Sequence, residues 1–157
     1  MIPLSIIMAI AAVESGGNAR AVGRNGELGI LQISKAVVDD CNRFQKTVHF
    51  VHEDALHPLR AEAMFRIYVG HYAERLFGDD QDAYNIACLW HYGPSGLGIS
   101  QGAERDYPRR VANMADYYER HKFDTITDKH WESMFARERA GLNANPIWPQ
   151  IHAALAK

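Results

Sequence analysis

The stretch AAVESGGNARAVGRNGELGILQIS, Ala11 to Ser34, joins an apolar run to a glycine-rich turn and then to a second, shorter apolar run. Glu14 stands where the first run stops, and Gln32 interrupts the second. Gly16 and Gly17 end the first run, because glycine readily adopts the left-handed conformation that closes a helix. Burial beside such a run raises the pKa of a carboxylic acid and allows it to donate a proton at neutral pH. Glu14 is therefore a candidate general acid, the alternative being a solvated glutamate at a helix end.

Outward from this stretch, the sequence predicts a mostly helical domain with a small β-hairpin near residues 22–33. Asn25-Gly26 is a typical hairpin turn, and the first helix should run from about Pro3 to Ser15. Apolar spacing, capping residues and proline positions predict the other helices. These are expected at residues 35–44, at residues 58–77, from an Asp80 cap to about Leu89, at residues 107–121, at residues 128–140, and from Pro146 onward.

Composition is that of one ordinary globular domain. The chain has 157 residues, of which 47% are hydrophobic and 23% charged. Lys+Arg number 17 and Asp+Glu 19, for a net charge of -2, which argues against a nucleic-acid binder. Cys41 and Cys88 are too few for a disulfide framework, so two buried thiols are favoured over one bridge.

The N-terminal run IPLSIIMAIAAV is similar to the core of a signal peptide. No basic residue precedes it, and it is too short to span a membrane. We interpret Ile2 to Val13 as the first core helix and expect no export signal and no membrane insertion. The chain would then be delivered by a phage, by a secretion machine, or as part of a longer protein.

Three short motifs resemble those of the lysozyme-like lytic transglycosylases, the group of the soluble lytic transglycosylases and goose-type lysozymes. They are VESGGN, GILQI and an AYN-type segment near Asp82. The resemblance implies a mainly α, α+β lysozyme-like fold with Glu14 as general acid and base. It further implies that Ser15 is the hydrogen-bonding neighbour of Glu14, that Gly29 lies in the floor of the β element, and that Gln32 supplies an amide to the sugar.

A late tyrosine and one departure complete the resemblance. Tyr107, in RDYPRRV, resembles the tyrosine that closes over the acid in this family. Where the family has Trp-Asn-Gly-Gly-Pro-x-Gly, this chain reads WHYGPSG, so His91 replaces the asparagine and Tyr92 a glycine. An alternative register uses Tyr84-Asn85, which lie inside a predicted helix. We expect Tyr92 and Tyr107 to contact substrate, and His91 as well, since imidazole can donate or accept a hydrogen bond.

The resemblance implies cleavage of the MurNAc-β-1,4-GlcNAc bond of peptidoglycan to leave 1,6-anhydro ends. Ordinary glycosidases use two carboxylates. Glu27 is the candidate for the second one, and the alternative is that Glu27 is a solvated charge on the hairpin. Two alternatives remain, a hydrolytic lysozyme and a peptidoglycan-binding module impaired by the change at His91. No cofactor and no metal are expected, because the histidines of HFVHEDALH lack partners at zinc-ligand spacing.

We expect a single lysozyme-like transglycosylase domain over residues 1–157, with residues 122–157 a helical extension packed on it. The partners should be peptidoglycan glycan strands and not nucleic acid, and the protein should be a monomer acting on the bacterial cell wall.

Overall fold

The computed structural model describes residues 2–97 and 106–120. The helices predicted at residues 128–140 and from Pro146, and the whole extension 122–157, lie outside the described residues. Within them the fold is mainly helical, which confirms the predicted class. The elements, in chain order, are α1 (Leu4–Ser15), α2 (Lys35–Phe44), the 3₁₀ helix η1 (His52–Leu56), α3 (Pro58–Phe77), α4 (Ala83–Tyr92) and α5 (Asp106–Arg120).

Local signals set most helix ends. The Ser34 hydroxyl accepts a hydrogen bond from the Val37 N–H and caps α2, while Pro58 occupies the first turn of α3. The cap of α4 is Asp82, whose carboxylate accepts from the Asn85 N–H at 2.8 Å, so the predicted cap Asp80 is wrong by two residues. Asp82 takes this place because it directly precedes the first helical residue.

The β element is smaller than the predicted hairpin. Two isolated antiparallel bridges pair Val22 with Leu28 and Leu28 with Ile33. The structure describes all of residues 22–33, and it has no strand there. The Asn25-Gly26 turn does form, closed by a hydrogen bond from the Gly23 N–H to the Glu27 carbonyl at 2.7 Å. Leu28 belongs to both bridges, so the chain reverses twice within a few residues and leaves no length for a ladder.

The 3₁₀ helix η1 was not predicted from the sequence. Its His52 lies within the histidine-rich segment, and the Nε2–H of that residue donates to the Ile33 carbonyl at 2.7 Å. This ring therefore ties η1 to the β element.

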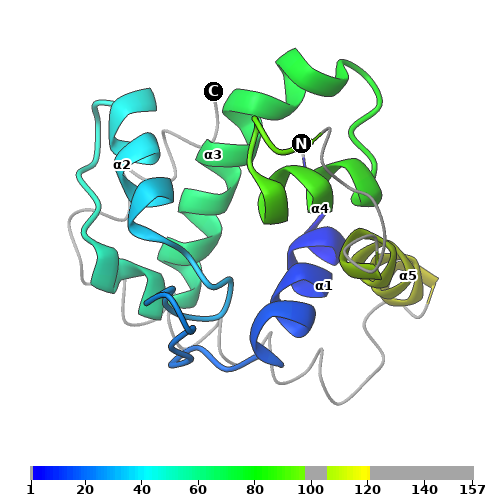
Figure 1. Ribbon diagram of the computed structural model, residues 1–157, viewed down its shortest axis with the longest axis horizontal. Helices are drawn as coiled ribbons and strands as arrows, with labels where there is room; N and C mark the ends of the chain where they lie inside the picture. Colours follow the sequence, from blue (N-terminus) through cyan, green and yellow to red (C-terminus); the bar gives the residue numbers. More distant parts are fainter. Residues whose placement is uncertain (1, 98–105, 121–157) are drawn as a thin grey trace.

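Figure 1 shows α2 beside α3 on one side of the molecule and α1, α4 and α5 on the other, with residues 16–34 crossing between the two groups. Contacts between α2 and α3 hold the first group together, contacts of α5 with α1 and α4 hold the second, and α3 contacts α4 across the two groups. The core contains large side chains from most of these elements. Its largest fully buried members are Phe50, Phe65, Ile7, Met8, Ile10, Ile30, Leu31, Ile33, Met64, Ile86 and Leu89.

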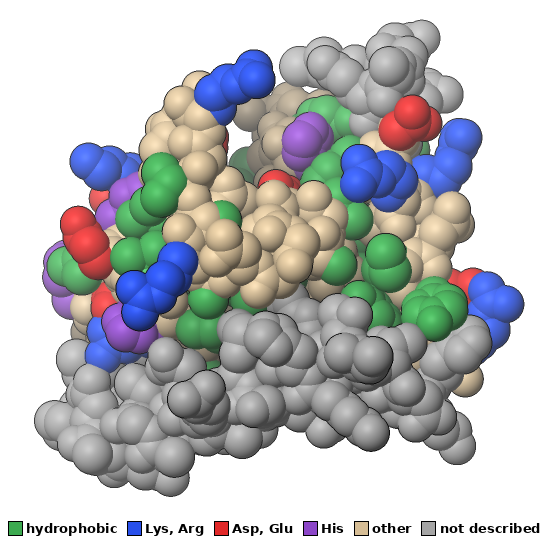
Figure 2. Space-filling model, turned by 90° about the horizontal axis from the view of Figure 1, so that it is seen from below, with side chains coloured by type: hydrophobic (Ala, Val, Ile, Leu, Met, Phe, Trp, Pro, Cys, Tyr) green, Lys and Arg blue, Asp and Glu red, His purple; other side chains and the backbone are tan. Residues whose placement is uncertain are grey.

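The surface carries both charges. Figure 2 shows Lys and Arg side chains interspersed with Asp and Glu over the described part of one face, as the net charge of -2 leads one to expect. The two thiols Cys41 and Cys88 are buried and free, as the composition predicted.

Candidate active site

The candidate acid Glu14 lies in the last turn of α1, half-buried. Gly16 ends the helix in the left-handed conformation (φ 61°), and its N–H donates back to the Ala12 carbonyl at 3.1 Å. The helix therefore stops one turn past the buried run Ile6–Ala11, which leaves Glu14 at the edge of the core. Burial raises the pKa of the Glu14 carboxyl above its ordinary value, and the nearby Glu27 carboxylate raises it further.

Tyr107, in the first turn of α5, closes over this acid. Its hydroxyl donates to Glu14 Oε1 at 2.6 Å, although the two residues are far apart in the sequence. The hydrogen bond favours the carboxylate and lowers the pKa of Glu14, which partly offsets the effect of burial. Burial and the Glu14 carboxylate raise the pKa of the Tyr107 phenol, so the hydroxyl stays protonated and remains a donor.

Ser15 connects α1 to the β element instead of bonding to Glu14. Its hydroxyl is directed at two main-chain carbonyls, that of Ile30 at 2.8 Å and that of Ala11 at 3.1 Å. The expected hydrogen bond from Ser15 to Glu14 is therefore replaced by a contact that fixes the backbone on either side of the acid.

Gly29 and Gln32, the residues that the resemblance assigns to the floor of the β element and to a sugar-contacting amide, lie in the segment that follows the Asn25-Gly26 turn. Gly29 has φ +76°, and a Cβ placed on it would lie 1.8 Å from the Ala55 carbonyl oxygen in η1, so no side chain fits there. Gln32 has φ 52°, the one positive value of a non-glycine residue among those described. Its Nε2 donates to the carbonyls of Gly29 (2.8 Å) and Ala21 (3.4 Å). Since both N–H donors are engaged, Oε1 is the atom left for a ligand.

Glu27 lies in the same cleft as Glu14, and its carboxylate and the Gln32 amide oxygen both lie next to Gly23. Its carboxylate accepts from the Asn25 N–H at 3.0 Å and from the Asn25 side-chain amide at 3.1 Å. Hydrogen bonds from its own main chain and from Asn25 lower the pKa of Glu27. One cleft therefore holds a carboxyl with a raised pKa and a carboxyl with a lowered pKa, a division typical of glycosidase sites.

The cleft that holds these groups has a volume of about 500 Å³. It lies between the β element with the start of α2 and the end of α4. Its lining residues are Glu14, Gly23, Arg24, Asn25, Glu27, Gln32, Ser34, Val37, Trp90 and His91. Four of the residues singled out from the sequence thus line one cleft: Glu14, Glu27, Gln32 and His91.

Trp90 and His91 form the α4 wall of the cleft. The Trp90 indole N–H donates to the Leu31 carbonyl at 3.3 Å, and its ring packs on Phe65 with centroids 4.7 Å apart. Tyr92 meets the edge of the His91 ring (centroids 4.7 Å) but does not line the cleft. Asn85 of the alternative register is outside the lining as well.

Sequence reasoning missed several lining residues, notably Arg24, Ser34 and Val37. Arg24 stands in the recognised turn, and Ser34 is the cap of α2, so both were visible as structural signals only. The chain reverses twice around Leu28, and these reversals decide which way the side chains face. No local sequence pattern predicts the two reversals.

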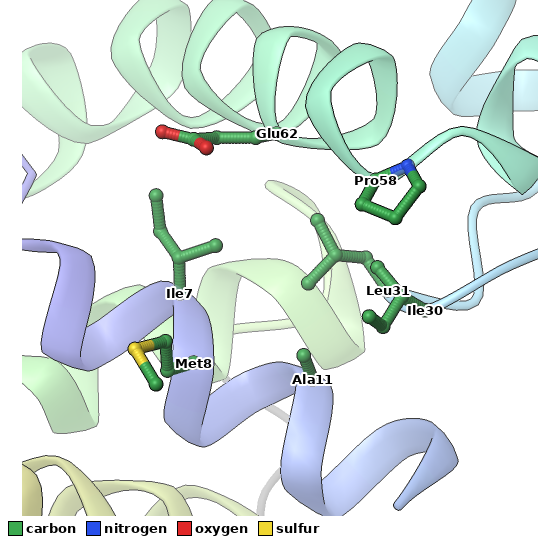
Figure 3. Close-up of a pocket in the computed structure, with 7 residues that line it drawn as sticks. All are labelled: Ile7, Met8, Ala11, Ile30, Leu31, Pro58 and Glu62. Atoms are coloured by element: carbon green, nitrogen blue, oxygen red, sulfur yellow. The ribbon is translucent and has the colours of Figure 1, made fainter. Parts of the chain in front are cut away.

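A second concavity is apolar and offers no comparable chemistry. Figure 3 shows it between α1, the segment Ile30–Leu31 and the start of α3. Its one charged lining residue, Glu62, accepts from the Arg66 Nε at 2.9 Å. We therefore place the candidate site in the polar cleft.

Two features of the described residues bear on other functions. None of the helices within residues 2–97 and 106–120 is long and apolar enough to cross a membrane. In the same ranges, no three His, Cys, Asp or Glu side chains gather as a metal site would need.

Comparison with known families matches residues 1–64 to the transglycosylase SLT domain. The matched segment contains Glu14, Ser15, Gly29 and Gln32, and it confirms the resemblance to the lysozyme-like lytic transglycosylases read from these motifs. It also supports a peptidoglycan transglycosylase type of function in general. No curated protein and no solved structure matches the chain.

Proposed function

We propose that this protein is a peptidoglycan lytic transglycosylase that cuts the MurNAc-β-1,4-GlcNAc bond with Glu14 as general acid and base. The observation that carries the proposal is a half-buried carboxyl with a raised pKa, in a polar cleft, under a tyrosine hydroxyl at 2.6 Å. Peptidoglycan is the substrate class that the SLT match supports.

In the first step, the Glu14 carboxyl gives its proton to the glycosidic oxygen while the bond from that oxygen to C1 of MurNAc breaks. In the second step, the Glu14 carboxylate takes the proton of the C6 hydroxyl as O6 bonds to C1, which closes the 1,6-anhydro ring. The proton thus returns to Glu14, and no second carboxylate is required. Gln32 Oε1 is placed to accept a hydrogen bond from the sugar, since its amide N–H groups are engaged.

Glu27 supports a second candidate, hydrolysis. Its low-pKa carboxylate lies in the same cleft and is held by Asn25. A water that this carboxylate activates could attack C1 in place of O6, which would leave an ordinary reducing end. Glu27→Gln removes that base. It also removes one of the effects that raise the pKa of Glu14, but it keeps Glu14 itself, the acid of the route through O6.

Mass spectrometry of soluble products from purified peptidoglycan tests both candidates. We expect anhydro-ended muropeptides, with a loss of about 100-fold or more in rate for Glu14→Gln. Glu53→Gln, at an exposed glutamate in η1, is the matched control and should act like the wild type. Products with reducing ends, absent when Glu27→Gln is used, would show that the protein is a hydrolytic lysozyme and not a lytic transglycosylase. A folded protein that pellets with the wall and releases no products would make it a binding module.

A further inference from the structure

His91 is the residue at which the chain departs from the family it resembles, and its ring lies flat on Tyr107. The centroids of the two rings are 4.1 Å apart and their planes differ by 19°. The hydroxyl of the same tyrosine donates to Glu14 Oε1 at 2.6 Å. A line of contact therefore runs from α4 through α5 to the acid at the end of α1.

We propose that His91 is a positioning residue, whose ring packs against the Tyr107 phenol and holds its hydroxyl on the Glu14 carboxyl. The proposal rests on the proposed function only in that Glu14 is taken as the acid. The contacts themselves exist whether or not the protein is an enzyme.

The phenol needs support because of where it stands. Tyr107 is the second residue of α5, so its side chain leaves the helix in the first turn. A hydrogen bond weakens steeply when its angle departs from linear, so rotation of the ring would weaken the contact with Glu14. A second ring stacked at 4.1 Å restricts that rotation, and near-parallel aromatic pairs add stabilisation of their own.

Packing of the His91 ring on Tyr107 also explains why histidine stands where the family that the chain resembles has asparagine. An asparagine has a short side chain with no ring and cannot cover a phenol face. The His91 side chain is exposed and lines the cleft while it covers Tyr107, so it bounds the space for substrate and supports the closing tyrosine together.

The hydrogen bond from Tyr107 lowers the pKa of Glu14, against the effect of burial. Without the His91 ring against it, the phenol should hold this hydrogen bond less well. The pKa of Glu14 is then lowered less, and its titration midpoint moves to higher pH. The direction is the same as for Tyr107→Phe, but the shift should be smaller because the hydroxyl is still present. Misplacement of the acid's partner should also reduce kcat about tenfold.

The experiment follows the Glu14 carboxyl carbon by NMR as pH changes, in protein labelled with ¹³C-glutamate and assigned with Glu14→Gln. We expect His91→Ala to raise the midpoint and His91→Phe, which keeps a flat ring, to restore it. His71→Ala is the matched control, because His71 is also exposed and stacks on Phe44 with centroids 3.6 Å apart, away from the cleft. This variant should leave the midpoint unchanged.

Coupling decides whether His91 acts through the tyrosine. In a Tyr107→Phe background, His91→Ala should add no further shift. An unchanged midpoint in His91→Ala, or an equal shift in both backgrounds, would overturn the proposal. A His91→Phe variant that behaves like His91→Ala would do the same, since a ring nitrogen would then be the active feature. If His91→Ala does not fold, His91→Gln is measured in its place.

The two proposals fail separately. The titration needs no substrate, so a protein without activity on peptidoglycan can still show the predicted shift. Conversely, the wild-type protein can yield anhydro products while His91→Ala leaves the midpoint of Glu14 unshifted. That result would support the proposed function and overturn the role of His91.

Discussion

At the scale of single residues, the chemistry of the cleft depends on opposing effects on one carboxyl. Burial and the negative charge of Glu27 raise the pKa of Glu14, and the Tyr107 hydrogen bond lowers it. The raising effect of burial is the largest, so the net direction is upward. An acid of this kind keeps a protonated fraction closer to neutral pH than an exposed glutamate does, as general acid catalysis requires.

Tyr107→Phe removes only the lowering effect. The pKa of Glu14 should then rise further. Because the proposed reaction begins with protonated Glu14, the alkaline limb of the kcat/KM profile should move to higher pH. The rate at the optimum should fall about tenfold, because the orienting contact is lost. The measurement is a pH series of initial rates on soluble glycan strands.

Tyr84→Phe controls for the loss of a phenol hydroxyl elsewhere, since Tyr84 is half-buried on α4 and does not line the cleft. Its profile should coincide with that of the wild type. An alkaline limb that moves to lower pH in Tyr107→Phe would mean that a group other than Glu14 supplies the proton.

At the scale of elements, the site depends on the segment 28–33 being held from several sides. Ser15 of α1, His52 of η1 and Trp90 of α4 each donate a side-chain hydrogen bond to one of its carbonyls. The segment has little pairing of its own beyond the two bridges at Leu28. Its shape, and with it the place of Gln32, therefore comes from its neighbours.

Gly29→Ala tests this dependence. Alanine at φ +76° is strained, and its Cβ would lie 1.8 Å from the Ala55 carbonyl, so η1 and the segment would have to separate. We expect a loss of about 2–4 kcal/mol in the free energy of unfolding, from the backbone strain and the clash together. Denaturant unfolding measures it.

Gly16→Ala is the matched variant, since Gly16 has φ +61° and open space around its Cβ position. It should lose only about 1 kcal/mol, through the left-handed conformation alone. Equal losses at the two glycines would mean that the close approach to η1 contributes nothing.

The sequence predicted the elements better than their contacts, for a physical reason. The bounds of α2 and α3 follow from Ser34, Pro58 and the apolar spacing, which act within a few residues. The resemblance supplied Tyr107 as the partner of the acid. The approach of Gly29 to Ala55 and the stacking of His91 on Tyr107 join residues from different elements, and tertiary packing alone decides them.

At the scale of the whole molecule, residues 16–34 cross between the group of α2 and α3 and the group of α1, α4 and α5 (Figure 1). Residues of this crossing segment line the cleft together with residues of α1, α2 and α4. The core is continuous from α1 to α5, yet its edge at the end of α1 holds a carboxyl whose charged form is disfavoured there. A group of this kind should lower the stability of the fold at neutral pH, as catalytic groups often do.

Glu14→Gln should therefore stabilise the protein at pH 7 while it abolishes activity. The folded-state pKa of Glu14 is raised above its unfolded value, so the unfavourable contribution is absent below the unfolded pKa, grows as pH rises through the window between the two values, and is complete above the folded one. Glutamine keeps an oxygen that can accept from the Tyr107 hydroxyl and carries no charge. We expect its Tm to exceed that of the wild type by roughly 2–4 °C at pH 7, with the difference fading as pH falls toward 4.

Differential scanning calorimetry across this pH range, with Glu53→Gln as the exposed control, measures the effect. The control should match the wild type at every pH, because Glu53 is exposed in η1. A Glu14→Gln variant less stable than the wild type at pH 7 would mean that the charged carboxylate is favoured in the fold. Its pKa would then be lowered, and Glu14 could not serve as the proton donor of the proposed reaction.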